Sequence, residues 1–312
     1  MTPLRLVILG GTGFVGGHLL NRLARDGHQL TVLTRNREKH RAIGVIPGVR
    51  LKSTDVHDPT QLRAAFEGAD AVINLVGILN NSGRETFQRV HVELTRQVIE
   101  ACKATGVPRL HQMSSLKAGQ GLSQYLKTRG EAEGLVRQSG LRWTLYQPSV
   151  IFGDGDGLVG RFAKILRLTP VLPLARTQSR LAPTFVGDVV EAIARCVSDD
   201  KLSLDRSFEL YGPQVLTLGE IVKAIRDAAG LRTRILPLPD ALGRLQARLA
   251  ELLPGKPFSL DNFRSLRTDS VGKVDGYAAL GIVPQPFTPW LERLIHGQPR
   301  LRRLDRARAL RR

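Results

Sequence analysis

Cysteine is scarce in this chain, and long apolar runs are absent. Among 312 residues only Cys102 and Cys196 are cysteines, far apart and without a CxxC spacing. This pattern excludes a disulfide framework and gives no sign of a zinc site, so both thiols are expected in the core of a protein from a reducing compartment. No segment reaches the roughly 18 consecutive apolar residues of a membrane span. The first expected strand begins at about Leu4, which leaves no room for a signal peptide, so a cytoplasmic protein is expected.

Carboxylates and aromatic side chains are also few. The chain has 28 Asp and Glu against 46 Lys and Arg, a formal net charge of +18 and a pI of about 10.9. Such a surplus predicts an acidic partner, whether nucleotide phosphate, anionic membrane, nucleic acid or acidic protein. Aromatic residues make up 5%, and no stacking motif accompanies the arginines, so specific nucleic-acid binding is not expected. The histidines show no metal-ligand spacing, so no metal site is expected, and His91 and His111 are expected to be structural.

Short β-branched runs alternate with longer helical patterns through the first half of the chain. LRLVILG at 4–10 and ADAVINLVG at 69–77 have the character of strands, and FVGGHLLNRLARDG at 14–27 that of a helix. Strands separated by helices of about ten residues predict βαβ units and a parallel sheet. The alternation of strands and helices becomes less regular after residue 150. Proline-rich segments there, such as TPVLPLA at 169–175, favour a smaller C-terminal lobe.

A glycine-dense run, ILGGTGFVGG at 8–17, joins the first strand to the first helix. Gly10 is expected to permit a tight turn, Gly13 to let backbone N–H groups approach a pyrophosphate, and Gly16 to let the helix pack close to the strand. The phosphates then lie at the positive end of the helix, next to Thr12, Phe14 and Val15. A turn without a ligand is the simpler alternative, but its place in a βαβ series favours a dinucleotide site.

These features together predict an α/β fold with a Rossmann-type doubly wound parallel sheet. We expect an NAD(P)-binding domain over residues 1–150 and a smaller α/β lobe over 151–298 that partly shares the strand order. A basic tail over 299–312 follows.

The stretch TVLTRNREKH at 31–40 indicates which dinucleotide is bound. An acidic residue at the end of the second strand would hold the ribose 2′-OH of NAD, whereas an arginine there fits a 2′-phosphate. Arg35 and Arg37, with Lys39, take that place, so NADP(H) is preferred over NAD(H), the alternative. Solvated loop charges would give the same pattern.

Several motifs give the chain a family resemblance. They include GGTGFVG at 10–16, TDVHD at 54–58, INLVGIL at 73–79, QMSSLKA at 112–118, SQYLKTRGEAE at 123–133, QPSVIFGDGD at 147–156 and PTFVGDVVEAI at 183–193. The chain resembles the extended and atypical short-chain dehydrogenase/reductases. Within them it is similar to the group of the nucleotide-binding accessory subunit of respiratory complex I and its epimerase/dehydratase-like bacterial relatives. The resemblance implies cofactor contacts at Asp55 and Val56 by the adenine, at Leu75, Val76 and Gly77 along the ribose and pyrophosphate, and at Pro148 and Val150 beside the nicotinamide.

The resemblance also implies catalytic positions, and here the chain departs from the family. The family pairs a proton-transferring tyrosine with a lysine four residues on, so that both lie on one helix face. This chain has Tyr125 with Arg129, and Lys127 lies roughly on the opposite face. Arginine can still hold a ribose but is essentially never deprotonated. Ser115, or alternatively Ser114, is expected to take the hydroxyl role, and Ser114, Tyr125 and Arg129 are also expected to contact the cofactor. Gln147 stands where relatives usually have arginine, which suggests that hydride transfer is weakened or lost.

The C-terminal region contains two arginine-rich amphipathic patterns. Residues 299–312, PRLRRLDRARALRR, hold seven arginines around Leu301, Leu304 and Leu310, and DALGRLQARLAELLPG at 240–255 is another arginine-bearing amphipathic pattern. Such helices suit an anionic lipid surface or an acidic partner, and a solvated terminus is the alternative.

Two functions stay open. One is an NADP(H)-binding accessory or assembly protein on the inner face of the membrane, linked to complex I or quinone metabolism. The other is an active NAD(P)H-dependent oxidoreductase or epimerase acting on a small hydrophobic or sugar-nucleotide substrate.

Overall fold

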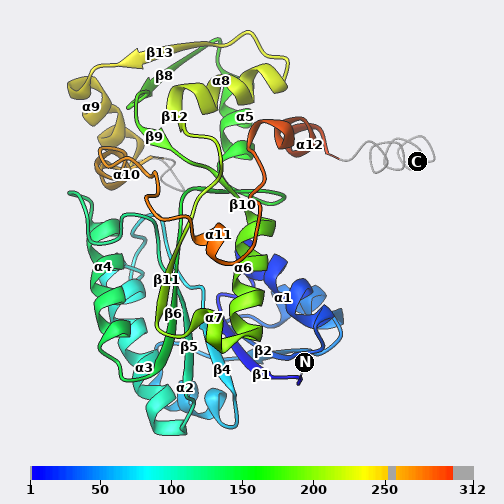
Figure 1. Ribbon diagram of the computed structural model, residues 1–312. Coiled ribbons are helices and arrows are strands. Elements are labelled where there is room, and N and C mark those ends of the chain that lie inside the picture. The colour runs from blue at the N-terminus through cyan, green and yellow to red at the C-terminus, as the bar shows by residue number, and fades with distance from the viewer. Residues whose placement is uncertain (1, 252–257, 298–312) are drawn as a thin grey trace.

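A seven-stranded parallel sheet organises the chain (Figure 1), whose computed structural model describes residues 2–251 and 258–297. The strand order is β3-β2-β1-β4-β5-β6-β11, and every neighbouring pair is parallel. The chain runs outward from β1 to β3 and then returns to β4 on the other side of β1. This reversal is the topological switch point of a Rossmann fold, beside which ligands bind at the carboxyl ends of the strands. The strands are β1 (Arg5–Leu9), β2 (Gln29–Thr34), β3 (Val49–Ser53), β4 (Ala71–Asn74), β5 (Arg109–Met113), β6 (Arg142–Pro148) and β11 (Arg206–Leu210).

Both faces of the sheet are buried, as β1 illustrates. Leu6 and Ile8 pack in one apolar core with the helices of one face, and Val7 and Leu9 pack in another with those of the opposite face. Alternate side chains of a strand point to opposite faces, so a strand buried on both sides is apolar throughout. One face carries α1 (Phe14–Arg25) and α6 (Val186–Ser198), and the other carries α2 (Pro59–Phe66), η2 (Gln88–Glu93), α3 (Leu94–Thr105) and α4 (Gln124–Arg137).

The register brings the ends of the central strands to one edge. Leu9 pairs with Leu33 on one side and with Asn74 on the other, while Gln112 pairs with Leu145. The loops after β1 to β6 therefore share the carboxyl edge of the sheet, and most of the expected cofactor residues lie in them. The seven-stranded parallel sheet confirms the predicted fold class.

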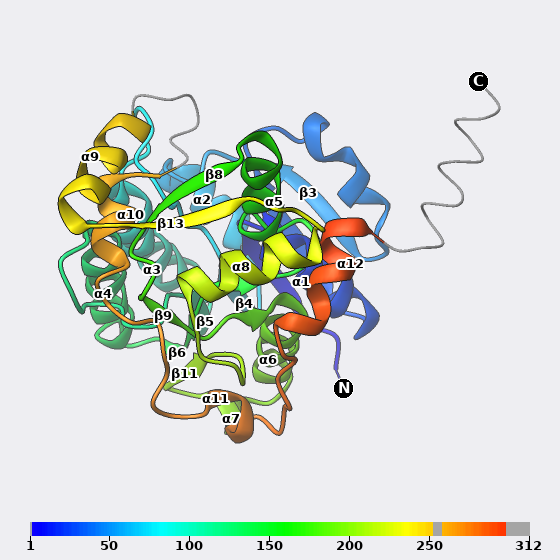
Figure 2. The ribbon, with the colours of Figure 1, turned by 90° about the horizontal axis from the view of Figure 1, so that it is seen from above.

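A smaller α/β lobe has its own core. Phe152, Ile221, Phe287 and Leu291 are at most 1% exposed and belong to one cluster that excludes the main sheet. Seen from above in Figure 2, α5, α8, α12 and the paired β8 and β13 group together. The lobe comprises β7 (Ile151–Phe152), α5 (Val159–Leu168), β8 (Val171–Ala175), β9 (Arg180–Leu181), β10 (Thr184–Phe185), β12 (Leu216–Thr217), α8 (Leu218–Ala228), β13 (Arg234–Leu238), α9 (Asp240–Ala250), α10 (Leu260–Ser265), η3 (Thr288–Trp290) and α12 (Leu291–His296).

The chain crosses between the two parts more than once. After β10 it returns to the main sheet as α6 and β11, and α11 (Gly276–Ala279) lies beside β11. The remaining elements are η1 (Glu38–Val45) and α7 (Asp200–Ser203). The lobe meets the carboxyl edge directly: Asn262 Nδ2 donates to the carbonyl of Leu79 at 3.1 Å. Within the described ranges no helix has the length and apolar character of a membrane span. The predicted tail at 299–312 lies outside the described residues.

Candidate dinucleotide-binding site

The glycine-rich turn after β1 has the conformation that its sequence predicts. Gly10 has φ +77°, in the left-handed region that favours glycine, and a side chain there would come within 3.0 Å of the Leu75 carbonyl carbon. A side chain at Gly16 would overlap the backbone of Gly10 and Gly11, so helix and turn meet closely. The N–H of Gly13 donates to the Gly10 carbonyl at 3.0 Å. The sequence predicts only that Gly13 lets backbone N–H groups approach a phosphate, and it does not indicate this bond within the turn.

The start of α1 is suited to an anion. Gly13 is its N-cap residue, no side chain caps it, and its first turn contains no acidic residue. The first N–H groups of a helix have no partner within the helix, and the helix dipole favours negative charge at this end. Thr12, Phe14 and Val15 surround this start and are partly buried. The turn is therefore suited to a phosphate, and the phosphate contacts expected from the sequence stay a prediction.

Arg35 and Arg37 directly follow β2, at the same edge. Both are open to solvent, with side chains 73% and 65% exposed. Arg35 Nη1 bonds Glu85 Oε1 at 2.9 Å, whereas Arg37 Nε lies 4.0 Å from Glu38 Oε1. Both positions are compatible with a ribose 2′-phosphate beyond β2.

The next strand ends contribute the expected neighbours. Asp55 follows β3, where its carboxylate accepts from the N–H of His57 at 3.0 Å, and Val56 beside it is half-buried. Asn74, which the sequence analysis did not single out, ends β4: its Oδ1 accepts from the Val76 N–H at 3.1 Å, and its Nδ2 donates to Gln112 Oε1 at 3.0 Å. This amide holds the turn at Leu75, Val76 and Gly77. A lone polar residue in the apolar strand AVIN is the signal that could have indicated it.

Arg129 is the most unusual group at this edge. It projects from α4 and is 5% exposed, with Nη1 donating to the Met113 carbonyl at 2.9 Å. Its Nε is buried without a hydrogen-bond partner, and no carboxylate of the described residues lies within ion-pair distance of it. A buried charge of this kind is costly unless it is paired. Any side chain at Gly77 would overlap Nη2 of Arg129, so the guanidinium lies against the turn after β4.

Tyr125 lies one turn before Arg129, which confirms that both share a face. Its ring packs edge-on against Phe87 and His91, with centroids 6.0 and 5.5 Å apart, and Arg129 Cζ is 5.6 Å from the ring centroid. Lys127 is exposed to solvent, as its spacing predicts. Asp261 of α10 accepts from the Tyr125 backbone N–H at 3.0 Å, so the smaller lobe fixes the start of α4.

His91 is buried and neutral beside this pair. Its Nε2 accepts from the Ile78 N–H at 3.4 Å, and its Nδ1 lies 2.9 Å from Thr128 Oγ1, which donates in turn to the Gln124 carbonyl. Burial, and then the charge of Arg129, lower the pKa of His91 to about 2. The histidine is thus a structural group, as expected, in the one-turn π-helix η2, a feature frequent near functional sites.

Two serine hydroxyls after β5 have no hydrogen-bond partner in the described part of the chain. Ser114 and Ser115 are 4% and 7% exposed, and neither Oγ finds a hydrogen bond among the described residues. Buried polar groups without partners are rare in native proteins, and each asks for a ligand or water. Together with the unpaired Nε of Arg129, they are suited to the hydroxyl-rich end of a dinucleotide. The residues at this edge therefore fit an NAD(P)H molecule.

Other predicted positions have simpler roles. The amide of Gln147 donates to Glu133 Oε1 on α4 at 2.7 Å, so its side chain is bound to this helix, and its expected bearing on hydride transfer stays a prediction. Pro148 is buried, and Val150 is half-buried where β6 leaves the sheet. Asp156 accepts from the N–H groups of Gly153 and Val159 at 2.8 Å, and thus caps α5. No metal-binding group of three His, Cys, Asp or Glu occurs in the described part.

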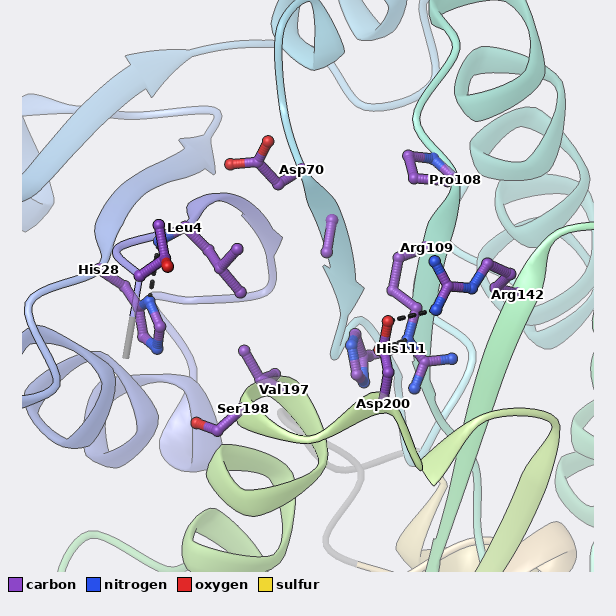
Figure 3. Close-up of a pocket in the computed structure, with 12 residues that line it drawn as sticks. Leu4, His28, Asp70, Pro108, Arg109, His111, Arg142, Val197, Ser198 and Asp200 are labelled. Atoms are coloured by element: carbon purple, nitrogen blue, oxygen red, sulfur yellow. Dashed lines mark hydrogen bonds and ion pairs between the residues drawn. The ribbon is translucent and has the colours of Figure 1, made fainter. Parts of the chain in front are cut away.

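A cavity of about 320 Å³ lies at the opposite, amino edge of the sheet (Figure 3). Leu4 and His28 line one side, and Arg109, Arg142 and Asp200 line the other. Arg109 Nε is 3.1 Å from Asp200 Oδ1, and Arg142 contacts the other carboxylate oxygen. No pattern in the sequence predicts this cavity, and its lining contains none of the predicted cofactor residues.

Comparisons with known proteins agree with this geometry. The NAD(P)H-binding family matches residues 10–163. Subunit 9 of the 1 alpha subcomplex of mitochondrial NADH dehydrogenase (ubiquinone) from Arabidopsis thaliana is 26% identical over 85% of this chain and 70% of its own length. A ceramide reductase of Caulobacter vibrioides is 29% identical over 75% of this chain and 74% of its own length.

A solved structure shows the same fold. The NADPH-dependent quinone oxidoreductase of Escherichia coli, complexed with NADPH, has a TM-score of 0.75 at 21% identity and covers 93% of this chain and 99% of its own. Residues 10–163 therefore match the NAD(P)H-binding family within a Rossmann fold, and the chain is similar over most of its length to subunit 9 of the mitochondrial NADH dehydrogenase 1 alpha subcomplex.

Proposed function

We propose that the protein binds NADP(H) at the carboxyl edge of its sheet and holds it with little hydride transfer. It would act as an accessory or assembly protein linked to respiratory complex I or to quinone metabolism at the membrane. The similarity to the complex I subunits supports this kind of role. The specific support comes from Arg129.

Arg129 supports a binding role because it takes the place of the family lysine. Its guanidinium is buried at 5% exposure, bonded to the Met113 carbonyl and without a carboxylate partner in the described ranges. Such a group gains from an anionic or hydroxyl-bearing ligand, which would use its unpaired Nε–H. A permanently charged arginine cannot exchange its own proton at neutral pH. The arrangement thus favours binding over proton transfer.

The other predicted residues would each hold a different part of the dinucleotide. The turn at Gly10–Gly16 would hold the pyrophosphate, Asp55 and Val56 the adenine, and Arg35 with Arg37 a 2′-phosphate. Ser114, Ser115 and Arg129 would hold the nicotinamide ribose, with Pro148 and Val150 beside the ring. When bound, NADPH supplies a hydride at this end. Tyr125 would be the proton donor in an active relative, and here we propose that its ring chiefly packs against Phe87 and His91.

The described part of the basic C-terminal region offers a docking face on α9. Its small residues Gly243 and Ala247 face the core, whereas Leu242, Leu245 and Leu249 are 52%, 52% and 58% exposed. Arg244 and Arg248 are exposed on the same helix. Exposed leucines at helical spacing beside arginines suit an anionic membrane surface. We propose that this face and the 299–312 tail dock the protein there, and that Leu245→Gln or a chain ending at Gln298 reduces cosedimentation with anionic vesicles.

Turnover in the Tyr125→Phe variant tests the binding role. NADPH affinity should stay within about twofold of the parent, and the low NADPH oxidation with quinones should not fall further. In an active reductase the same change would remove most turnover, because general acid catalysis supplies about 10²–10⁴-fold. A large loss of activity with unchanged binding would refute the binding role.

An active NAD(P)H-dependent reductase or epimerase is the second candidate. The observation in its favour is the pair of unpaired hydroxyls at Ser114 and Ser115, near a tyrosine that shares a helix face with a cation. Two of the similar proteins are named as reductases, of ceramide and of quinones. The Tyr125→Phe measurement separates the two candidates.

A further inference from the structure

Glu85 places its carboxylate at the carboxyl edge of the sheet, where the cofactor is expected to bind. It lies in the loop between β4 and η2, in a turn closed by two hydrogen bonds: Ser82 N–H to the Glu85 carbonyl at 2.9 Å, and Glu85 N–H to the Ser82 carbonyl at 3.0 Å. Gly83 in this turn has φ +54°, which glycine adopts readily. The backbone of Glu85 is therefore held in place.

Its carboxylate contacts two segments on the far side of β1. Oε1 accepts from Arg35 Nη1 at 2.9 Å, and Oε2 lies 3.8 Å from His57 Nε2. Arg35 follows β2, and His57 lies between β3 and α2. Because β1 separates β4 from β2 in the sheet, the loop that carries Glu85 spans the carboxyl end of β1. The carboxylate thus lies beside the arginine expected to recognise the ribose 2′ position.

This placement changes the charge that a ribose would meet. NAD-binding proteins use a carboxylate to hold the ribose 2′-OH, whereas a 2′-phosphate needs an arginine. Here both groups are present, and the carboxylate comes from another loop. A 2′-phosphate must replace Glu85 as the partner of Arg35 and then lie next to a like charge. A 2′-OH can donate to Glu85 and leave the ion pair intact.

We propose that Glu85 is a specificity-determining residue that limits the preference for NADP(H) by competing with the 2′-phosphate for Arg35. The inference rests on the proposed cofactor site. Glu85→Gln should release Arg35, keep the backbone turn and remove the negative charge. Since an exposed ion pair is worth up to about 1 kcal/mol, affinity for a 2′-phosphate should rise by about fivefold. Affinity for a nucleotide with a free 2′-OH should stay level or fall.

Calorimetric titration with adenosine 2′,5′-bisphosphate and with 5′-AMP tests this on the full chain. A matched control is Glu67→Gln, which makes the same charge change at an exposed carboxylate that ends α2 and takes no part in the ion pairs of Arg35 and Arg37. We expect Glu85→Gln to tighten the bisphosphate about fivefold without tightening 5′-AMP, and Glu67→Gln to stay within twofold of the parent.

Each other outcome has a definite meaning. Equal affinities of Glu85→Gln and the parent for the bisphosphate, or equal shifts for both nucleotides, would overturn the role of Glu85 and leave the cofactor site standing. A similar gain in Glu67→Gln would show a general charge effect and would also overturn it. If the parent binds neither nucleotide, the proposed cofactor site itself fails, and the inference fails with it.

Discussion

The guanidinium of Arg129 lies against Gly77, so closely that any side chain at residue 77 would overlap its Nη2. A larger residue after β4 would therefore displace the end of the Arg129 side chain from its present position. The contact joins the turn that should carry the ribose and pyrophosphate to the helix that carries Tyr125.

Replacing Arg129 should separate stability from binding. Arg129→Met keeps much of the volume and removes a buried charge that has no carboxylate partner among the described residues, so thermal stability of the unliganded protein should stay level or rise. NADPH affinity should fall by about tenfold or more, because a hydrogen bond to a charged group is worth about 1.5–3 kcal/mol. Differential scanning fluorimetry with and without NADPH measures both. Unchanged affinity would show that Arg129 does not contact the cofactor.

Two adjacent glycines of α1 provide a matched pair. Gly16→Ala should cost about 1–3 kcal/mol and weaken NADPH binding, since its methyl group meets the backbone of Gly10 and Gly11. At Gly17 nothing lies within 4 Å of the added carbon, and Gly17→Ala should stabilise the helix by about 0.5–1 kcal/mol. Urea unfolding compares them. Equal effects of the two substitutions would contradict the close approach at Gly16.

Acid sensitivity should arise in part from His91. Its pKa in the folded protein is about 2, so below pH 6.5 the unfolded chain takes up a proton that the folded chain does not. Stability from this group is complete above pH 6.5 and declines as pH falls toward 2. From pH 7 to pH 5 the loss is about 2 kcal/mol at 1.36 kcal/mol per unit. His91→Gln should lose that much less over this range in urea unfolding. Parallel pH profiles would mean that His91 titrates normally.

Cofactor choice should depend on Arg35. In fluorescence titrations at fixed salt, NADPH should bind at least about tenfold more tightly than NADH, a difference of about 1.4 kcal/mol and the scale of one charge-assisted contact. Arg35→Ala should reduce that ratio and leave NADH binding nearly unchanged. A preference for NADH in the parent protein would sink the assignment of the 2′-phosphate to this loop.

Local patterns predict the framework of this protein and part of its site. The apolar run of β1, the alternation of strands with helices, and the glycines at 10 and 16 follow from chain geometry within a few residues. The spacing of four also places Tyr125 and Arg129 on one face of α4. These features depend on neighbours in sequence, which a single chain displays.

Contacts between distant segments could not be predicted in this way. The bond from Gln147 to Glu133, the ion pair of Glu85 with Arg35 and the return of β11 to the main sheet depend on how whole elements pack. The burial of Arg129 belongs here as well, because the spacing of its motif gives its helix face but not the absence of a carboxylate among its described neighbours. The outward leucines of α9 arise because Gly243 and Ala247 let the helix pack on Ala175 and Phe263.

The most direct test of a binding role is the redox state of dinucleotide held by the purified full-length protein. NADPH absorbance and fluorescence should be followed after addition of quinones or cell extract, with Arg129→Lys as the variant that restores the family's residue. We predict that the parent protein binds NADPH and keeps it reduced, whereas Arg129→Lys oxidises it faster. Rapid stoichiometric oxidation by the parent, or no binding of NADPH at all, would contradict the account.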